Sequence, residues 1–137
     1  MSNVGQVERK TQDRIVELFS DSLDYEYLGN WEHRVGNSNV EVDLLMANLK
    51  ARDYDDNLIS RAADRLKSEA SLGGGRDLYE ANEDVYRLLR YGVKVKPGVG
   101  EQTETVWLID WANPDANHFA VAEEVTVAGS HTKRPDL

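Results

Sequence analysis

The chain has 137 residues, of which 40% are hydrophobic and 30% are charged, and its formal net charge is −9 at pH 7. This length suits one domain of ordinary size. The absence of cysteine excludes disulfides, thiolate metal sites and a thiol nucleophile. The acidic balance argues against nucleic-acid binding by this chain alone through a broad basic surface, because such binding requires Lys and Arg to neutralise phosphates. A small nucleic-acid site that other domains support remains open.

The sequence gives no reason to expect a membrane partner. No stretch approaches the roughly 18 consecutive apolar residues of a membrane span, and the polar N-terminus does not resemble a secretory signal. We therefore expect a cytoplasmic protein whose acidic surface serves mainly solubility.

Helical periodicity dominates the first two thirds of the chain. An amphipathic helix is predicted from about Val4 to Leu23, with an apolar stripe made by Val4, Val7, Thr11, Ile15, Leu18, Ser22 and Phe19. The aromatic segment DYEYLGNW then predicts a short strand and a turn. Residues 37–71 predict two further helices, the first capped by Asn39 and the second by Asp55 or Asp56. The second helix has an apolar face formed by Leu58, Ile59, Ala62, Ala63, Leu66 and Ala70.

The period of the hydrophobic pattern changes in the last third of the chain. LGGGRD is predicted to be a loop, since no Gly-Lys-Ser/Thr follows its glycines. A helix beginning at Asp77 or Asn82 and ending at Gly92 comes next. Three alternating runs then predict strands in GVKVKPG, TETVWLID and NHFAVAEEVTV, with turn residues between them. The fold class is therefore α/β with an α+β-like order, in which N-terminal helices pack on a mixed, mostly antiparallel sheet arranged as a meander.

Most residue types that carry chemistry lack a supporting pattern here. His33, His118 and His131 show no metal-binding spacing, and no serine lies in a G-x-S-x-G turn. The three tryptophans lack the interleaved Lys and Arg of a base-stacking platform. Carboxylates are therefore the main catalytic candidates.

Two positions stand out among the carboxylates. Asp136 follows Arg134-Pro135 at the start of a predicted strand, where proline is tolerated. Glu123 interrupts the apolar face of FAVAEEVTV, so it either faces inward with a partner or belongs to a β-bulge. The adjacent Glu124 favours the bulge, because one extra residue would restore the alternation.

An acid at the start of a strand is where metal-dependent nucleases of the PD-(D/E)xK kind place their first ligand. Mg²⁺ takes oxygen ligands and keeps several waters. An aspartate, a second acid on the next strand and a lysine can hold the metal, orient a water and stabilise the charge on the phosphate. A further acid often comes from a helix packed against the sheet. The letters P-D alone are too common to assign this role.

The C-terminal segment NHFAVAEEVTVAGSHTKRPDL resembles the stretch that leads into the nuclease core of the type I restriction endonuclease R (HsdR) subunit. The matching residues are Asn117, Phe119, Gly129, Arg134, Pro135 and Asp136. Residues 78–119 are similar to the helix of that family, its GV-V strand and its IDW-NP-N-F strand. VERKTQDRIVELF and YEYLGNW resemble its opening helix and turn, although the usual Gly-Tyr order is not kept.

The resemblance implies the residues and partners of a nuclease. Asp136 matches the metal-binding, catalytic aspartate, and Glu8 is the best match to the helix glutamate that assists at the metal, with Glu17 as the alternative on the same helix. The cofactor implied is Mg²⁺, and ATP binds motor domains that are outside this chain. The partners implied are double-stranded DNA and the modification (M) and specificity (S) subunits of a type I restriction complex.

The E-x-K pair and the downstream Q-x-x-x-Y element of the family do not occur before Leu137. We therefore expect residues 1–137 to be a single partial domain with a partial PD-(D/E)xK fold, truncated just after its first catalytic acid and inactive alone. The alternative is a naturally short, non-catalytic protein that docks on a restriction complex or mimics DNA. A small-ligand enzyme using Glu123 and Glu124 is a third possibility.

Overall fold

The structure is a computed structural model that describes residues 4–126. Its tertiary contacts divide the chain into two compact units. Unit 1 combines the residues up to Asn39 with those from His118 onward, and unit 2 is the continuous segment Val40–Asn117. No helix within residues 4–126 is long and apolar enough to cross a membrane.

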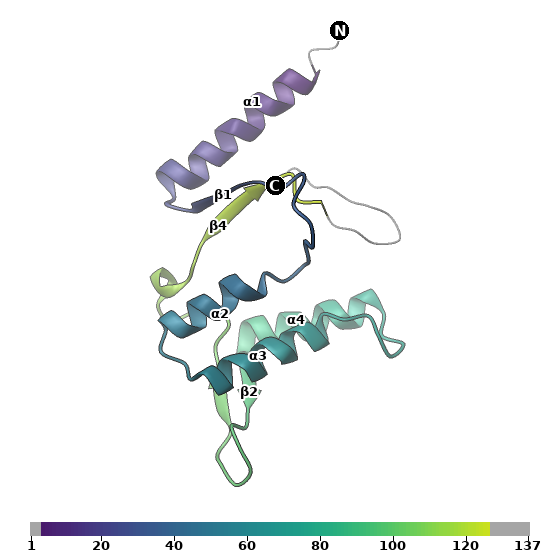
Figure 1. The fold of residues 1–137 in the computed structure, drawn as a ribbon, viewed down its shortest axis with the longest axis vertical. Coiled ribbons are helices and arrows are strands. Elements are labelled where there is room, and N and C mark those ends of the chain that lie inside the picture. Colours follow the sequence, from purple (N-terminus) through teal and green to yellow (C-terminus); the bar gives the residue numbers. More distant parts are fainter. Residues whose placement is uncertain (1–3, 127–137) are drawn as a thin grey trace. The chain divides into compact units, whose positions relative to one another are not determined.

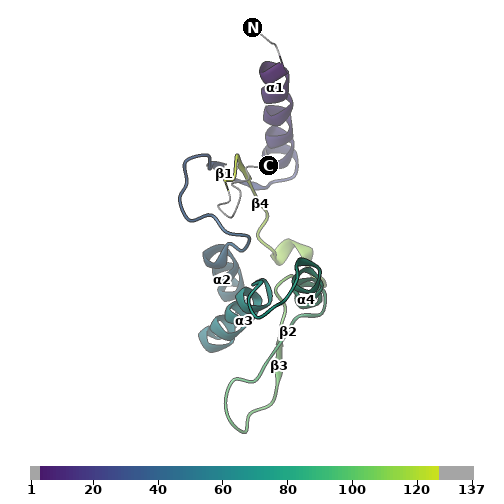
Figure 2. The same ribbon diagram turned by 90° about the vertical axis from the view of Figure 1, so that its right-hand side faces the viewer.

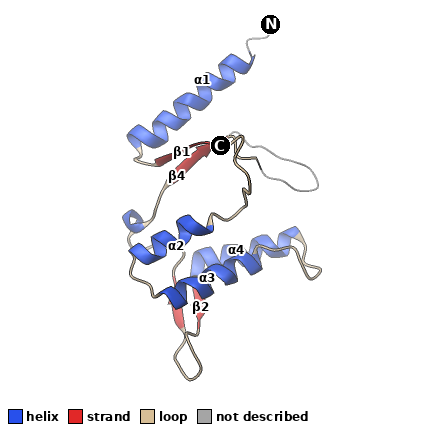
Figure 3. Cartoon of the chain, viewed as in Figure 1, coloured by secondary structure: helices blue, strands red, loops and turns tan. Residues whose placement is uncertain are grey.

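Unit 1 consists of a helix and a parallel pair of strands (Figures 1 and 3). Helix α1 (Val4–Glu17) continues into a π-helical segment, η1 (Leu18–Ser22), which confirms the first predicted helix. Strand β1 (Glu26–Asn30) pairs in parallel with β4 (Ala120–Glu123). This pairing shows that the predicted meander was wrong for its third strand, which joins β1 instead of its sequence neighbours. The long connection that parallel strands require is supplied by the residues between β1 and β4.

Three partly exposed aromatic rings pack against one another in unit 1. The ring centroid of Tyr25 lies 4.8 Å from that of Phe19 and 5.2 Å from that of Phe119. The stripe predicted on α1 was wrong, however, because Val7 is 62% exposed while Gln12 is only 5% exposed. A helix packed on a two-stranded sheet buries only a narrow face, and here that face includes a polar side chain.

Unit 2 places three helices around a β-hairpin. Its elements are α2 (Val42–Ala51), α3 (Asp56–Glu69), α4 (Leu78–Tyr91), β2 (Val93–Val95), β3 (Glu104–Val106) and the 3₁₀ turn η2 (Pro114–Ala116). Strands β2 and β3 are antiparallel, with Val93 opposite Val106 (Figure 2). The core consists of Leu49, Leu58, Ile59, Ala62, Leu66, Leu88, Val93, Val95, Val106 and Leu108. The described residues therefore form an α/β protein, as predicted, with one parallel and one antiparallel strand pair.

The helix boundaries in unit 2 follow most of the predicted signals. Asp77 caps α4 by accepting a hydrogen bond from the Glu80 backbone N–H at 2.7 Å, and Asp55 directly precedes α3. The predicted cap at Asn39 was wrong, because α2 begins after Glu41. The predicted apolar face of α3 is buried, apart from the half-buried Ala70 at its end.

Gly92 joins α4 directly to β2. Its φ of 79° lies in the left-handed region, and a Cβ at this position would be 2.6 Å from Cγ2 of Thr105. Glycine alone satisfies both conditions. The helix can therefore end against the hairpin without an intervening loop.

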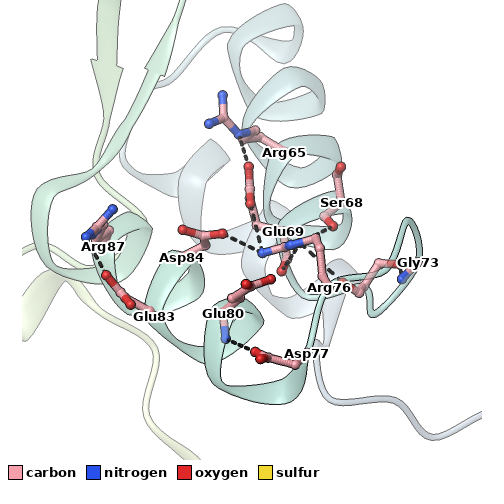
Figure 4. A network of polar contacts seen from close by, with 11 residues as sticks. Arg65, Ser68, Glu69, Gly73, Arg76, Asp77, Glu80, Glu83, Asp84 and Arg87 are labelled. Carbon is pink, nitrogen blue, oxygen red and sulfur yellow. Dashed lines mark hydrogen bonds and ion pairs between the residues drawn. The ribbon is translucent and has the colours of Figure 1, made fainter.

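Arg76, in the loop before α4, connects α3 to α4 (Figure 4). Its guanidinium donates to the backbone oxygen of Glu69 at 2.8 Å and to Oδ2 of Asp84 at 2.6 Å. The Glu69 carboxylate also pairs with Arg65 at 2.8 Å. Arg76 thus satisfies a carbonyl in the last turn of α3 and neutralises acids on both helices, which makes this network structural.

Candidate functional site

A polar cluster lies at the carboxyl edge of the parallel strand pair in unit 1. Glu123 is the last residue of β4 and only 2% of it is exposed. Its register partner, Asn30, is the last residue of β1. The carboxyl ends of parallel strands meet at one edge of a sheet, and in α/β folds this edge commonly holds the functional groups.

Two side chains from separate elements compensate for the burial of Glu123. The hydroxyl of Tyr27, on β1, donates a hydrogen bond to Oε2 of Glu123. The guanidinium of Arg9, on α1, lies 3.4 Å from Oε1, at ion-pair distance. No described residue donates a hydrogen bond to Oε1. A buried carboxylate requires such compensation, since desolvation of an unpaired charge is costly.

The inward orientation of Glu123 corrects the preference for a β-bulge at Glu123–Glu124. The register irregularity lies in β1, between Tyr27 and Gly29, where Gly29 has a φ of 102°. Glu123 stays in the regular ladder, because its carboxylate has partners from α1 and β1. The alternative in which Glu123 faces inward with a partner is therefore confirmed.

The hydrogen bond to Glu123 also changes the acidity of Tyr27. This bond raises the pKa of the Tyr27 phenol above its ordinary value of 10.0, and burial and the negative charge of Glu123 act in the same direction. The neutral phenol is the donor that the carboxylate needs, so the cluster favours the protonated tyrosine.

The chain leaves the sheet directly after this cluster. Glu124 has a φ of 53°, which is uncommon for a residue other than glycine. The Gln12 side-chain amide, which is buried on α1, donates to its Oε1 at 3.4 Å. Two polar contacts, Arg9 with Glu123 and Gln12 with Glu124, therefore connect α1 to the end of β4 and to the residue after it.

The cluster suits anchoring better than catalysis by itself. Arg9 supplies the positive charge beside Glu123, which disfavours a metal ion at the same carboxylate. Within residues 4–126 no group of three His, Asp or Glu side chains is arranged to hold a metal ion. The cluster fixes α1 against the end of β4.

The predicted site residues fall on different parts of the chain. Asp136 lies outside the described residues. Glu8 and Glu17 are both exposed on α1. Glu8 is adjacent to Arg9 and so is level with the end of β4, whereas Glu17 lies eight residues beyond Arg9, about 12 Å along the helix axis.

The described residues form an α/β protein with a buried acidic residue, Glu123, at the carboxyl edge of a parallel strand pair. The family model described as "Type I restriction enzyme R protein N terminus (HSDR_N)" matches residues 5–137. The chain belongs to this family, which confirms the resemblance found in the sequence. Comparisons with curated proteins and with solved structures gave no match.

Sequence reasoning missed the partners of Glu123. Arg9 and Gln12 lie outside the apolar stripe predicted on the first helix, and Tyr27 is one aromatic residue among several in the segment DYEYLGNW. The one available signal was Glu123 itself, since a buried acid predicts a buried donor elsewhere. Which donor meets it depends on parallel pairing between segments about 90 residues apart, as the Tyr27–Glu123 separation of 96 shows.

Proposed function

We propose that the chain is the N-terminal part of the nuclease domain of a type I restriction enzyme R subunit. The observation that carries this proposal is the family match over residues 5–137. The complete subunit would cleave double-stranded DNA with Mg²⁺ after ATP-driven translocation, in a complex with M and S subunits. The nuclease core would be of the PD-(D/E)xK kind, and the α/β class of the described residues is compatible with it.

In this proposal Asp136 is the first metal ligand and Glu8 is the assisting acid. Their carboxylate oxygens are the donor type that Mg²⁺ prefers. When bound, Mg²⁺ would supply an activated water and offset negative charge on the phosphate. One feature supports Glu8 over Glu17: its position beside Arg9, whose guanidinium pairs with Glu123 at the end of β4. The anchor made by Arg9 and Glu123 would hold α1, and with it Glu8, in place.

The test is plasmid cleavage by the assembled R, M and S subunits with ATP and Mg²⁺. We expect Asp136→Ala to abolish cleavage and to leave ATP hydrolysis unchanged, because the motor domains are separate from the nuclease. Glu8→Ala should lower cleavage, and the matched variant Glu17→Ala should not. Full cleavage by the Asp136→Ala complex would overturn the assignment.

The chain of 137 residues should be inactive by itself, since one carboxylate holds Mg²⁺ poorly without its companions. Magnesium-dependent nicking that persists through purification and disappears in Asp136→Ala would contradict this. If Asp136→Ala has no effect in any assembly, and the chain instead inhibits an intact restriction complex, the alternative of a non-catalytic interaction protein is favoured.

A further inference from the structure

Unit 2 contains a positively charged groove in an acidic chain. The groove has a volume of about 470 Å³ and is lined by Arg61, Asp64 and Arg65 of α3 and by residues 93–96 of β2 and its end. Its lining holds four basic side chains and one acidic side chain, whereas the whole chain carries a net charge of −9. The sign of the groove is therefore opposite to that of the protein.

Most of the positive charge in the groove is not neutralised. Arg61 is hydrogen-bonded only to a neutral partner, Oδ1 of Asn57 at 3.1 Å, and Lys94 donates to Oγ1 of Thr105 at 2.7 Å. Neither of these side chains nor Lys96 forms an ion pair with a carboxylate within residues 4–126. Asp64, the acid in the lining, is itself 3.7 Å from Lys67.

The basic side chains form two rows, one on α3 and one on β2 and the residue after it. Arg61 and Arg65 lie four residues apart on α3, about 6 Å along the helix axis. Lys94 and Lys96 lie two residues apart, about 6.6 Å along an extended chain. The buried valines of β2 hold the second row against the core, since Val93 is 1% exposed and Val95 is 5% exposed. A DNA strand presents a phosphate about every 3.4 Å along its axis, so each row spans about two phosphates.

The lining suits a chain of phosphates better than a single phosphate. It contains no glycine and no helix N-terminus, and these are the features that supply backbone N–H groups to one bound anion. Long Lys and Arg side chains in rows instead give a sequence-independent contact with a repeating charge. Arg65 belongs to the row on α3. It is paired with Glu69 (Figure 4), but its side chain is 54% exposed and can also contact a phosphate.

We propose that this groove binds the phosphodiester backbone of duplex DNA, as a positioning surface made of residues other than Glu8 and Asp136. The choice of DNA as the polyanion rests on the proposed function, whereas the binding itself requires neither Mg²⁺ nor Asp136. The groove contacts phosphates and reads no base sequence.

The experiment measures binding of a fluorescein-labelled mixed-sequence duplex to the 137-residue chain by anisotropy, in EDTA, between about 50 and 200 mM KCl. Three to four phosphate contacts predict a slope of log K against log salt of about −2.7 to −3.6. The double variant Lys94→Gln/Lys96→Gln should make the slope shallower by about 1.8. Asp64→Asn should tighten binding, because it removes the acid from the lining.

The matched control is Lys50→Gln/Arg87→Gln, which changes the net charge equally at two exposed cations that are paired with Asp56 and Glu83. This control should leave the slope close to that of the wild type. Equal slopes for the two double variants, or no binding at the lowest salt, would overturn the proposal. A dimer that forms while duplex binding is absent would also overturn it, and would indicate strand pairing at the β2 edge.

The two proposals fail separately. If the lysine substitutions leave the salt dependence of duplex binding unchanged while the assembled complex still depends on Asp136 for cleavage, only the groove proposal fails. If the lysine substitutions make the salt dependence of duplex binding shallower, but cleavage is insensitive to Asp136→Ala, only the nuclease assignment fails. Unchanged circular-dichroism melting of each variant confirms that these exposed substitutions act on binding.

Discussion

At the scale of single residues, Glu123 is a buried carboxylate in unit 1 that needs partners to offset its desolvation. Its side chain is buried, whereas both of its partners are about half exposed: Tyr27 is 45% exposed and the Arg9 side chain is 49% exposed. Because these partners reach solvent, water and salt screen their interaction with Glu123 and reduce its contribution to the free energy of unfolding. The cluster therefore stabilises unit 1 mainly by avoiding an uncompensated charge.

We expect Glu123→Ala to lower the free energy of unfolding by about 1–3 kcal/mol, because it removes the acceptor of Tyr27 and leaves a cavity. Urea denaturation of the chain measures this change. Glu17→Ala removes an exposed acid and should stay within about 0.5 kcal/mol of the wild type. Equal stabilities of the two variants would show that the cluster contributes nothing.

The raised pKa of Tyr27 predicts a loss of stability at alkaline pH. The folded chain holds the phenol proton more tightly than the unfolded chain, so the contribution is complete below the ordinary pKa of 10.0 and is lost as the pH rises above it. Tyr27→Phe should therefore lose less stability than the wild type between about pH 9 and pH 11. Thermal melts across that range test this, with Tyr79→Phe, at a 76% exposed residue, as the control. Parallel pH profiles for wild type and Tyr27→Phe would contradict the expectation.

At the scale of elements, the junction between α4 and the hairpin depends on one glycine. Gly92 combines a positive φ with close contact to Thr105, so a side chain there meets both backbone strain and a steric clash. Gly74 has a similar φ, 74°, but nothing lies within 4 Å of its Cβ position. Alanine substitutions at the two glycines therefore separate the free-energy cost of left-handed backbone strain from the cost of a steric clash.

We expect Gly92→Ala to destabilise the chain by about 2–5 kcal/mol, from left-handed strain and overpacking together. Gly74→Ala should cost about 1–2 kcal/mol, from strain alone. Chemical denaturation of both variants gives the difference. If Gly92→Ala is no worse than Gly74→Ala, the hairpin moves freely away from the helix end.

At the scale of the whole molecule, unit 2 is a continuous segment with its own core, whereas unit 1 combines two distant segments. The prediction of one partial domain over residues 1–137 is open to a direct test. We expect residues 40–117 alone to fold cooperatively, with a stability of only about 3–5 kcal/mol, because a core in a chain this short is small.

Thermal melting followed by circular dichroism checks this. Gly92→Ala should lower the midpoint of the isolated segment strongly or unfold it, because its expected cost of about 2–5 kcal/mol is close to the whole stability of the segment. A non-cooperative melt of residues 40–117 would show that unit 2 folds only with the rest of the chain, as expected of a single domain.

The sequence by itself determined the local structure and the family of this protein. The helices, the glycine that ends α4, the buried face of α3 and the resemblance to the R-subunit N terminus all follow from neighbouring residues or from short motifs. Helix periodicity and capping depend on residues close together in the chain, so they can be predicted without knowing the tertiary structure. The predicted roles of Asp136 and Glu8 also came from motifs and stay predictions.

Only the tertiary structure decided which distant segments meet. The parallel pairing of β1 with β4, the inward position of Glu123 and the burial of Gln12 all depend on contacts between residues far apart in the chain. The groove that joins Arg61 to Lys94 has the same origin. Side-chain alternation fixes which face of a strand is apolar, but not which strand lies beside it. Loop closure over such distances depends on the summed packing of the whole fold, and no short pattern encodes it.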